Sequence, residues 1–343
     1  MLLNISGIFP FNRCNGKPYK SLICESVKAT ISVVFILVYI YLVVLEVKNC
    51  EQNKNPVINT LANIIMLFYR CFILFKWSKL QKICSLTSSF GTKNGRKYKF
   101  WVTIWLLISV VKSVLLEIYD ILAVLDDGIP YIHYGIPKEN TVMYTIVAAL
   151  HSLYFFFAYI PIIALDLFYV LVCDNLRCAI KNFSVVLSSD TKDYDVLLRS
   201  YATIKSSVRF IDDELSVFVF FNVTLSSVMM YQTISLILHT EPKIFAMSTI
   251  QVLVHFFYTL AAFVAVIISA SMVSEASDEV RLKTQDLKLD KTNAMVQLRF
   301  QSCAESEVHL TVWKMVPLRR SFALGTISAI FTYSILFDNL TMK

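Results

Sequence analysis

The sequence is poor in charged residues. Only 17% of its 343 residues are charged and 56% are hydrophobic, whereas soluble domains carry about 25% charged residues. The apolar excess is concentrated in blocks, and a membrane helix needs about 20 mostly apolar residues. This composition excludes an ordinary soluble domain and predicts a multi-pass membrane protein with spans near 27–47, 57–76, 101–125, 141–173, 215–238, 247–274 and 320–341.

Familiar catalytic and ligand-binding motifs are also lacking. The sequence has no P-loop, dinucleotide-binding, zinc-protease or nucleophile-elbow motif. Its eight cysteines form no CxxC pair and its five histidines are scattered, so the spacing that a zinc site needs is missing. We therefore expect no enzyme activity, no catalytic or metal-binding residues, no cofactor and no nucleic-acid partner.

Lysine and arginine are scarce in every second loop between the apolar blocks. In short loops these residues stay on the cytoplasmic side of the membrane. The segments 1–26, 77–100, 174–214 and 275–320 hold 23 of them, against five in the alternate segments. We predict an all-α membrane protein with seven transmembrane helices, a cytoplasmic amino terminus, an extracellular carboxyl terminus and cytoplasmic helical extensions. This orientation is the reverse of that of a G-protein-coupled receptor.

The two long inner segments, 174–214 and 275–312, carry apolar residues among charges. The spacing in the first is helical over Leu197–Ile211, and the run SSDTKD at 188–193 predicts a turn with helix caps. Two interpretations remain open. The helices are solvated with some mutual packing, or they form an assembly bundle beneath the membrane, because amphipathic helices need a partner that the sequence does not name.

The last block, 320–341, carries its polar residues along one helical face. Spacings of three and four residues place six positions on a single stripe: Ser321, Gly325, Ser328, Thr332, Ile335 and Asn339. In a membrane, small and polar residues either form a tight helix–helix seam or line a pore, where polar rings hold water and apolar rings gate it. Asp338 lies one position off the stripe. The pattern alone leaves seam and pore open.

Polar and aromatic residues also gather in the outer halves of the middle blocks. Ligand pockets combine apolar and aromatic walls with a few polar groups, although a single residue of this kind more often belongs to an interfacial belt. Lys112 and Asp166 lie deeper, where we expect the two charges to pair. The predicted orientation places the candidate pocket residues at one depth: Glu117, Tyr119, Asp120, His151, Tyr154, Tyr231, Gln232, Gln251 and His255.

The stretch PLRRSFALGTISAIFTYSILFDNL, residues 317–340, resembles the carboxyl-terminal signature of insect gustatory receptors. In that signature Thr-Tyr is followed by five mostly apolar residues and then Gln-Phe. Here Thr332 and Tyr333 match, whereas Asn339 and Leu340 stand in place of Gln and Phe. The upstream run LLRSYATIKSSVRFIDDELSVF resembles the family's approach to its fifth span. Ser334 follows Thr-Tyr where sugar receptors carry Glu, which favours a bitter-type or divergent receptor.

The resemblance implies a receptor subunit of the plasma membrane that forms a ligand-gated, non-selective cation channel opened by a small-molecule tastant. It implies a homo- or heterotetramer of related subunits in the lipid bilayer, with a pocket open to the outside. The alternatives are a metabotropic seven-span chemosensory receptor that signals through intracellular partners, or a transporter using Lys112 and Asp166. The implied pore and gate residues are Ser328, Thr332, Tyr333, Ile335, Asp338, Asn339 and Leu340.

Four regions follow from the predicted spans and the resemblance. Residues 1–26 are a cytoplasmic segment, and 27–274 form a six-helix ligand-sensing domain that includes the cytoplasmic helices at 174–214. Residues 275–319 form a cytoplasmic anchor helix, and 320–343 are the pore-lining seventh helix with its tail.

Overall fold

The computed structural model describes most of the second half of the chain and parts of the first. The described residues are 56–89, 141–188, 193–239, 245–287 and 294–341, with isolated positions within 33–44 and 103–111. The predicted spans 27–47 and 101–125 therefore lie outside the described residues, apart from those positions. The chain divides into two compact units; the first is Met1–Arg70, Arg96–Leu165 and Thr240–His255, and the second is Cys71–Gly95, Asp166–His239 and Phe256–Lys343.

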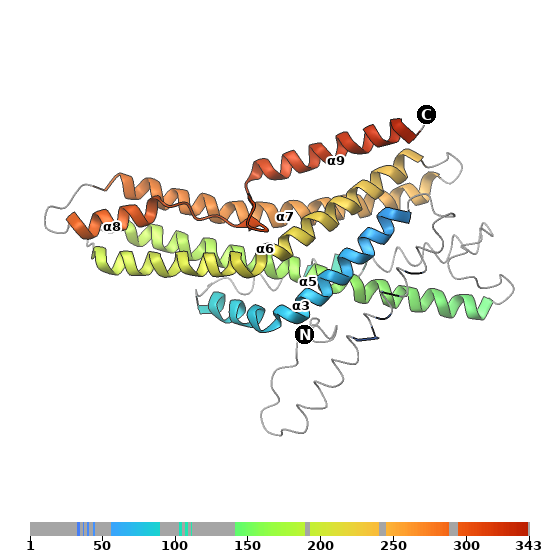
Figure 1. Cartoon of the computed structure of the whole chain (residues 1–343), viewed down its shortest axis with the longest axis horizontal. Coiled ribbons are helices and arrows are strands. Elements are labelled where there is room, and N and C mark those ends of the chain that lie inside the picture. Colours follow the sequence, from blue (N-terminus) through green and yellow to red (C-terminus); the bar gives the residue numbers. More distant parts are fainter. Residues whose placement is uncertain are drawn as a thin grey trace, which may run out of the picture. The chain divides into compact units, whose positions relative to one another are not determined.

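Long helices make up nearly all of the described chain (Figure 1). The expectation of a helical protein is confirmed, with one exception: a two-stranded antiparallel hairpin stands where a continuous anchor helix was expected. The elements in order are α3 (Pro56–Ser89), α5 (Thr141–Leu187), α6 (Tyr194–His239), α7 (Phe245–Gln285), α8 (Ala294–Glu305), β1 (Thr311–Val312), β2 (Val316–Pro317) and α9 (Arg320–Thr341).

Within the described residues, two helices are long and apolar enough to cross a membrane, Tyr194–Leu238 of α6 and Val252–Gln285 of α7. A third is present if Thr60–Ile73 and Phe75–Thr87 of α3 form one broken span. Both α6 and α7 far exceed the roughly 20 residues that a bilayer requires, so each extends well beyond its apolar part. The other predicted spans that the structure covers also lie within helices, and their orientation stays a prediction.

The predicted break between two helices is observed, because α5 ends at Leu187 and α6 begins at Tyr194, while residues 189–192 of the predicted turn lie outside the described residues. At the start of α6 the carboxylate of Asp193 accepts hydrogen bonds from the backbone N–H groups of Asp195 (3.1 Å) and Val196 (3.3 Å). This is an N-cap, which satisfies backbone donors that a first helical turn leaves unpaired.

An aromatic cluster joins four helices of the second unit. The rings of Phe183 (α5), Tyr201 (α6) and Phe300 (α8) lie 5.1 to 6.3 Å apart between centroids, and Tyr201 and Phe300 are 1% and 0% exposed. The Tyr201 hydroxyl shares a hydrogen bond of 3.1 Å with Ser277 of α7. The segments 174–214 and 275–312 therefore pack against each other within one chain.

Candidate functional site

The helix α9 is packed on one face only. Ala323 and Ser334 are 6% and 3% exposed, and α9 contacts α6. The ring of Phe331 lies 5.9 Å from that of Phe256 on α7. The Ser334 hydroxyl donates to the Ile330 carbonyl of its own helix at 2.7 Å, so it needs no partner on a neighbouring helix.

The small and polar stripe lies on the opposite, exposed face of α9. Five of its six predicted members have exposed side chains, or in the case of glycine an exposed backbone: Ser321, Gly325, Ser328, Thr332 and Ile335. The sixth, Asn339, lies within α9, but its side chain is outside the described residues. The stripe is therefore not the seam that holds α9 to the other described helices of this chain.

Gly325 and Thr332 show that nothing in the described chain occupies this face. A Cβ atom added to Gly325 would meet no atom within 4 Å, although glycine in a helix interior costs about 1 kcal/mol relative to alanine. The Thr332 hydroxyl donates to the Ser328 carbonyl at 2.8 Å. Packing within the described chain explains neither the small residue nor the exposed hydroxyl.

Of the three remaining predicted pore residues, only one has a described side chain. Tyr333 is 57% exposed, while Asp338 and Leu340 lie within α9 with side chains outside the described residues. The sequence-based assignment of an outer constriction to Asn339 and Leu340 thus stays a prediction.

Charged pairs fix the start of α9. Arg320 binds Glu275 of α7 through two contacts of 2.8 Å, and Arg319 lies 3.3 Å from Glu307, just beyond α8. Exposed pairs of this kind contribute about 0–1 kcal/mol each. Their role here is geometric, since they tie the start of α9 to α7 and to the segment after α8.

The hairpin before α9 is fastened to α6. The carboxylate of Asp212 accepts hydrogen bonds from the Thr311 backbone N–H (2.6 Å) and from its hydroxyl (2.9 and 3.0 Å). The Trp313 backbone N–H donates to the Ser216 carbonyl at 3.0 Å, and its ring lies 4.6 Å from that of Phe220. The chain that enters α9 is therefore attached directly to α6.

The turn of the hairpin is conformationally unusual. Trp313 and Lys314 have φ angles of 47° and 58°, a left-handed conformation that Gly or Asn normally adopts. Lys314 pairs with Asp213 at 2.7 Å, and this hydrogen-bonded carboxylate raises the pKa of Lys314. The ion pair of Lys314 and the ring contact of Trp313 thus connect this turn to α6.

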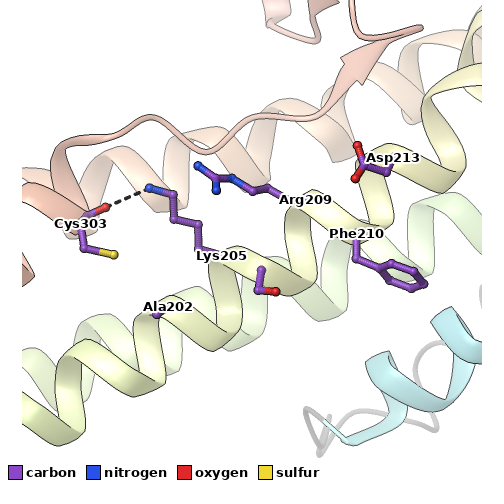
Figure 2. A pocket seen from close by; sticks show the side chains of 7 residues that line it. Ala202, Lys205, Arg209, Phe210, Asp213 and Cys303 are labelled. Carbon is purple, nitrogen blue, oxygen red and sulfur yellow. Dashed lines mark hydrogen bonds between the residues drawn. The ribbon is translucent and has the colours of Figure 1, made fainter.

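A cavity of about 420 Å³ lies beside α6, near the end of α8. Lys205 and Arg209 are one helical turn apart and point to the same side of α6 (Figure 2). The Lys205 ammonium donates to the backbone carbonyls of Cys303 (3.1 Å) and Ser306 (3.3 Å). No sequence pattern indicated this site, because Lys205 and Cys303 are far apart in the chain and neither belongs to a recognisable motif.

The predicted outer pocket is not tested by the described residues. Glu117, Tyr119 and Asp120 lie outside them, and the side chains of His151, Tyr154 and Gln251 are likewise not described, although these three residues lie in helices α5 and α7. Tyr231 and Gln232 on α6, and His255 on α7, are half-buried. Their membership of one pocket stays a prediction.

Asp166 has a polar partner on α6. The Asn222 amide donates to its carboxylate at 2.5 Å, and Ser226 donates to the Asn222 carbonyl oxygen at 3.2 Å. Both Asp166 and Asn222 are buried. The expected partner, Lys112, lies outside the described residues, so the predicted ion pair is not tested.

No family model and no curated protein matches the sequence. The structure, however, is similar to that of the insect olfactory receptor OR5 from Machilis hrabei in complex with eugenol, with a TM-score of 0.78 and 12% identity over 99% of this chain and 96% of that one. A second structure of that receptor gives a TM-score of 0.71 at 12% identity over 98% and 95% of the two chains. The chain thus has the fold of an insect olfactory receptor.

Proposed function

We propose that this chain is a subunit of a ligand-gated, non-selective cation channel that responds to small molecules, and that it serves as a gustatory receptor of the plasma membrane. Four subunits, identical or related, surround a pore lined by α9. The tastant belongs to the bitter-type or a divergent class, since Ser334 replaces the Glu of the sugar class.

The observation that carries this proposal is the exposed stripe of α9 in a chain with the fold of an insect olfactory receptor. A membrane helix normally turns its small and polar residues toward a partner helix. Here the packed face has small residues of its own, Ala323 and Ser334, and the stripe of further small and polar residues on the opposite face remains exposed. Repeated around a central axis, Ser328 and Thr332 would form polar rings and Ile335 an apolar ring, as a gated pore requires.

The contacts beneath α9 support a gating route. Asp212 and Ser216 of α6 hold the hairpin that leads into α9. A ligand opens a channel only if it binds the open state more tightly than the closed state. In the proposed mechanism a small molecule, as eugenol is for OR5, binds near the outer end of α6, shifts this helix, and thereby moves the hairpin and α9.

Whole-cell recording of the chain expressed in cultured cells tests the proposal. A panel of bitter small molecules should evoke currents carried by both sodium and potassium ions, alone or with related subunits present. Asn339→Ala should change permeation or resting leak, because the shortened side chain removes an amide from the proposed outer constriction. Ser200→Ala, an exposed position on α6 away from the stripe, is the control.

Three outcomes would contradict the proposal. Surface-expressed protein that gives no current with any compound or related subunit would argue against a channel. Ligand-evoked responses that persist without a membrane conductance and require intracellular partners would favour the metabotropic alternative. Uptake of the ligand without current would favour a transporter.

A further inference from the structure

The cavity beside α6 is lined by two positively charged side chains, and the one described acidic side chain that lines it is already paired with another residue. Among its described lining residues, Lys205 and Arg209 are basic and Asp213 is the acid. Asp213 is already engaged by Lys314 at 2.7 Å. Within the described part of the chain, no acid forms an ion pair with Arg209. Two like charges four residues apart on a helix repel each other, so a bound anion would stabilise this arrangement.

Lys205 is an ordered donor at the wall of the cavity. Its side chain is buried, with a residue exposure of 7%, and two of its three N–H donors are directed to the carbonyls of Cys303 and Ser306. These contacts fix the ammonium group and leave a further donor. The Arg209 guanidinium, whose residue is exposed, points to the same side of α6 (Figure 2). Its planar donors suit the oxygens of a phosphate.

The size of the cavity limits the ligands that it can hold. The volume of about 420 Å³ falls within the range of roughly 300–1,000 Å³ that small-molecule sites have. It therefore admits a phosphorylated ring or headgroup, which is larger than a lone phosphate ion.

The place of the cavity along α6 matters for the source of the phosphate. Arg209 precedes Leu215, where the predicted apolar span begins, by six residues, or about 9 Å of helix. On the predicted orientation this is the depth of the cytoplasmic headgroups, and basic pockets at that depth bind phosphorylated lipids.

We propose that Lys205 and Arg209 form a binding site for a phosphorylated ligand, either the headgroup of a lipid or a soluble organic phosphate. The site joins α6 to the segment that follows α8, because Lys205 holds the carbonyls of Cys303 and Ser306. A ligand that binds the folded state also stabilises it, so occupancy should fasten α6 to this segment.

Purified full-length protein in detergent tests the proposal by native mass spectrometry and thermal unfolding. The probes are phosphatidylinositol bisphosphate, phosphatidylcholine and soluble inositol trisphosphate. The wild type should retain the bisphosphate lipid in preference to phosphatidylcholine and unfold at a higher temperature when it is present. Arg209→Gln should weaken this binding about tenfold, since a hydrogen-bonded charge is lost.

Arg199→Gln is the matched control. Arg199 is an exposed arginine of α6 that does not line the cavity, so its removal changes the net charge equally and should leave binding unchanged. Tight binding of the lipid with weak binding of inositol trisphosphate identifies a lipid site, whereas equal binding of the two identifies a soluble phosphate as sufficient. Equal effects of the two substitutions, or no retention of either phosphorylated probe, would overturn the proposal. If Arg209→Gln changes the oligomeric state but not the binding of either phosphorylated probe, the proposal is wrong and the cavity is instead a contact site for a second copy of the chain.

Discussion

At the scale of single residues, the Asp212–Thr311 contact is the clearest link between α6 and the chain that enters α9. The carboxylate accepts bonds from both the N–H and the hydroxyl of Thr311, and the Thr311 hydroxyl in turn accepts from the backbone N–H of Lys314 at 3.1 Å. Thr311 is 9% exposed. Loss of its hydroxyl would leave a partly buried carboxylate and a turn N–H with fewer partners.

We therefore predict that Thr311→Val lowers the free energy of unfolding by about 1–3 kcal/mol, the range for a buried polar group deprived of its partner. The measurement is thermal unfolding of the detergent-purified protein, followed by tryptophan fluorescence. Thr311→Ser keeps the hydroxyl and should unfold close to the wild type. Equal stability of the valine and serine variants would show that the hydroxyl does not hold the hairpin.

At the scale of elements, the two faces of α9 make opposite predictions. Ala323 is buried against the rest of the chain, whereas Ser328 lies on the exposed stripe. Ala323→Phe should overpack the buried face and reduce stability by about 1–3 kcal/mol. Ser328→Leu should leave the stability of the subunit nearly unchanged, because no described side chain packs on it, yet reduce the evoked current per surface channel.

Thermal unfolding and surface-normalised current, measured on both variants, separate the two faces. Loss of stability in Ser328→Leu, with an unchanged current, would place the stripe in a structural seam. Leu324→Ala is the control, because Leu324 is an exposed residue of α9 next to the stripe. It tests whether any substitution on the exposed part of α9 changes the stability or the current.

The hairpin before α9 carries a prediction of its own. Lys314 has a φ of 58°, and a left-handed conformation costs roughly 1–2 kcal/mol for a residue with a Cβ. Lys314→Gly and Lys314→Val both remove the ion pair with Asp213, so their comparison isolates the backbone. The valine variant should be less stable by about 1 kcal/mol or more in chemical or thermal unfolding. Equal stability would mean that the turn relaxes to another conformation.

The elements also show how far the sequence could predict the structure. The boundaries of the last helix and the turn at SSDTKD followed from apolar periodicity and from capping residues, which act locally. The hairpin did not, because Trp313 and Lys314 lack the Asn-Gly type of signal that marks a tight turn. It exists through distant partners, Asp212 and Ser216 on α6, and no local pattern reveals such partners.

The candidate site likewise has one part that the sequence predicted and one part that it did not. The helical stripe was readable because its residues share one helix, and only its exposure required the fold. The cavity could not be predicted from the sequence, because it combines α6 side chains between Ala202 and Asp213 with Cys303, about a hundred residues later. The aromatic cluster of Phe183, Tyr201 and Phe300 was likewise not predicted, because its residues come from three helices whose sequence patterns do not show that they pack together.

At the scale of the whole molecule, function depends on the orientation in the membrane. The basic residues of alternate loops, among them Arg319 and Arg320, predict an inside amino terminus. The helix α9 begins at Arg320 and runs for 22 residues, or about 33 Å of helix, which is long enough for a hydrocarbon core of about 30 Å. If its basic start is cytoplasmic, the residues after Thr341 emerge outside.

We accordingly predict that an epitope tag at the amino terminus binds antibody only after the cells are permeabilised, whereas a tag at the carboxyl terminus binds in intact cells. A cytosolic marker that stays unlabelled in the intact cells provides the control. Labelling of the amino-terminal tag in intact cells would mean that α9 has the reverse orientation, with Arg319 and Arg320 outside the cell. This result would contradict the proposed channel orientation. If the carboxyl-terminal tag binds antibody only after permeabilisation, α9 does not span the membrane. The pore would then have to be lined by a different helix.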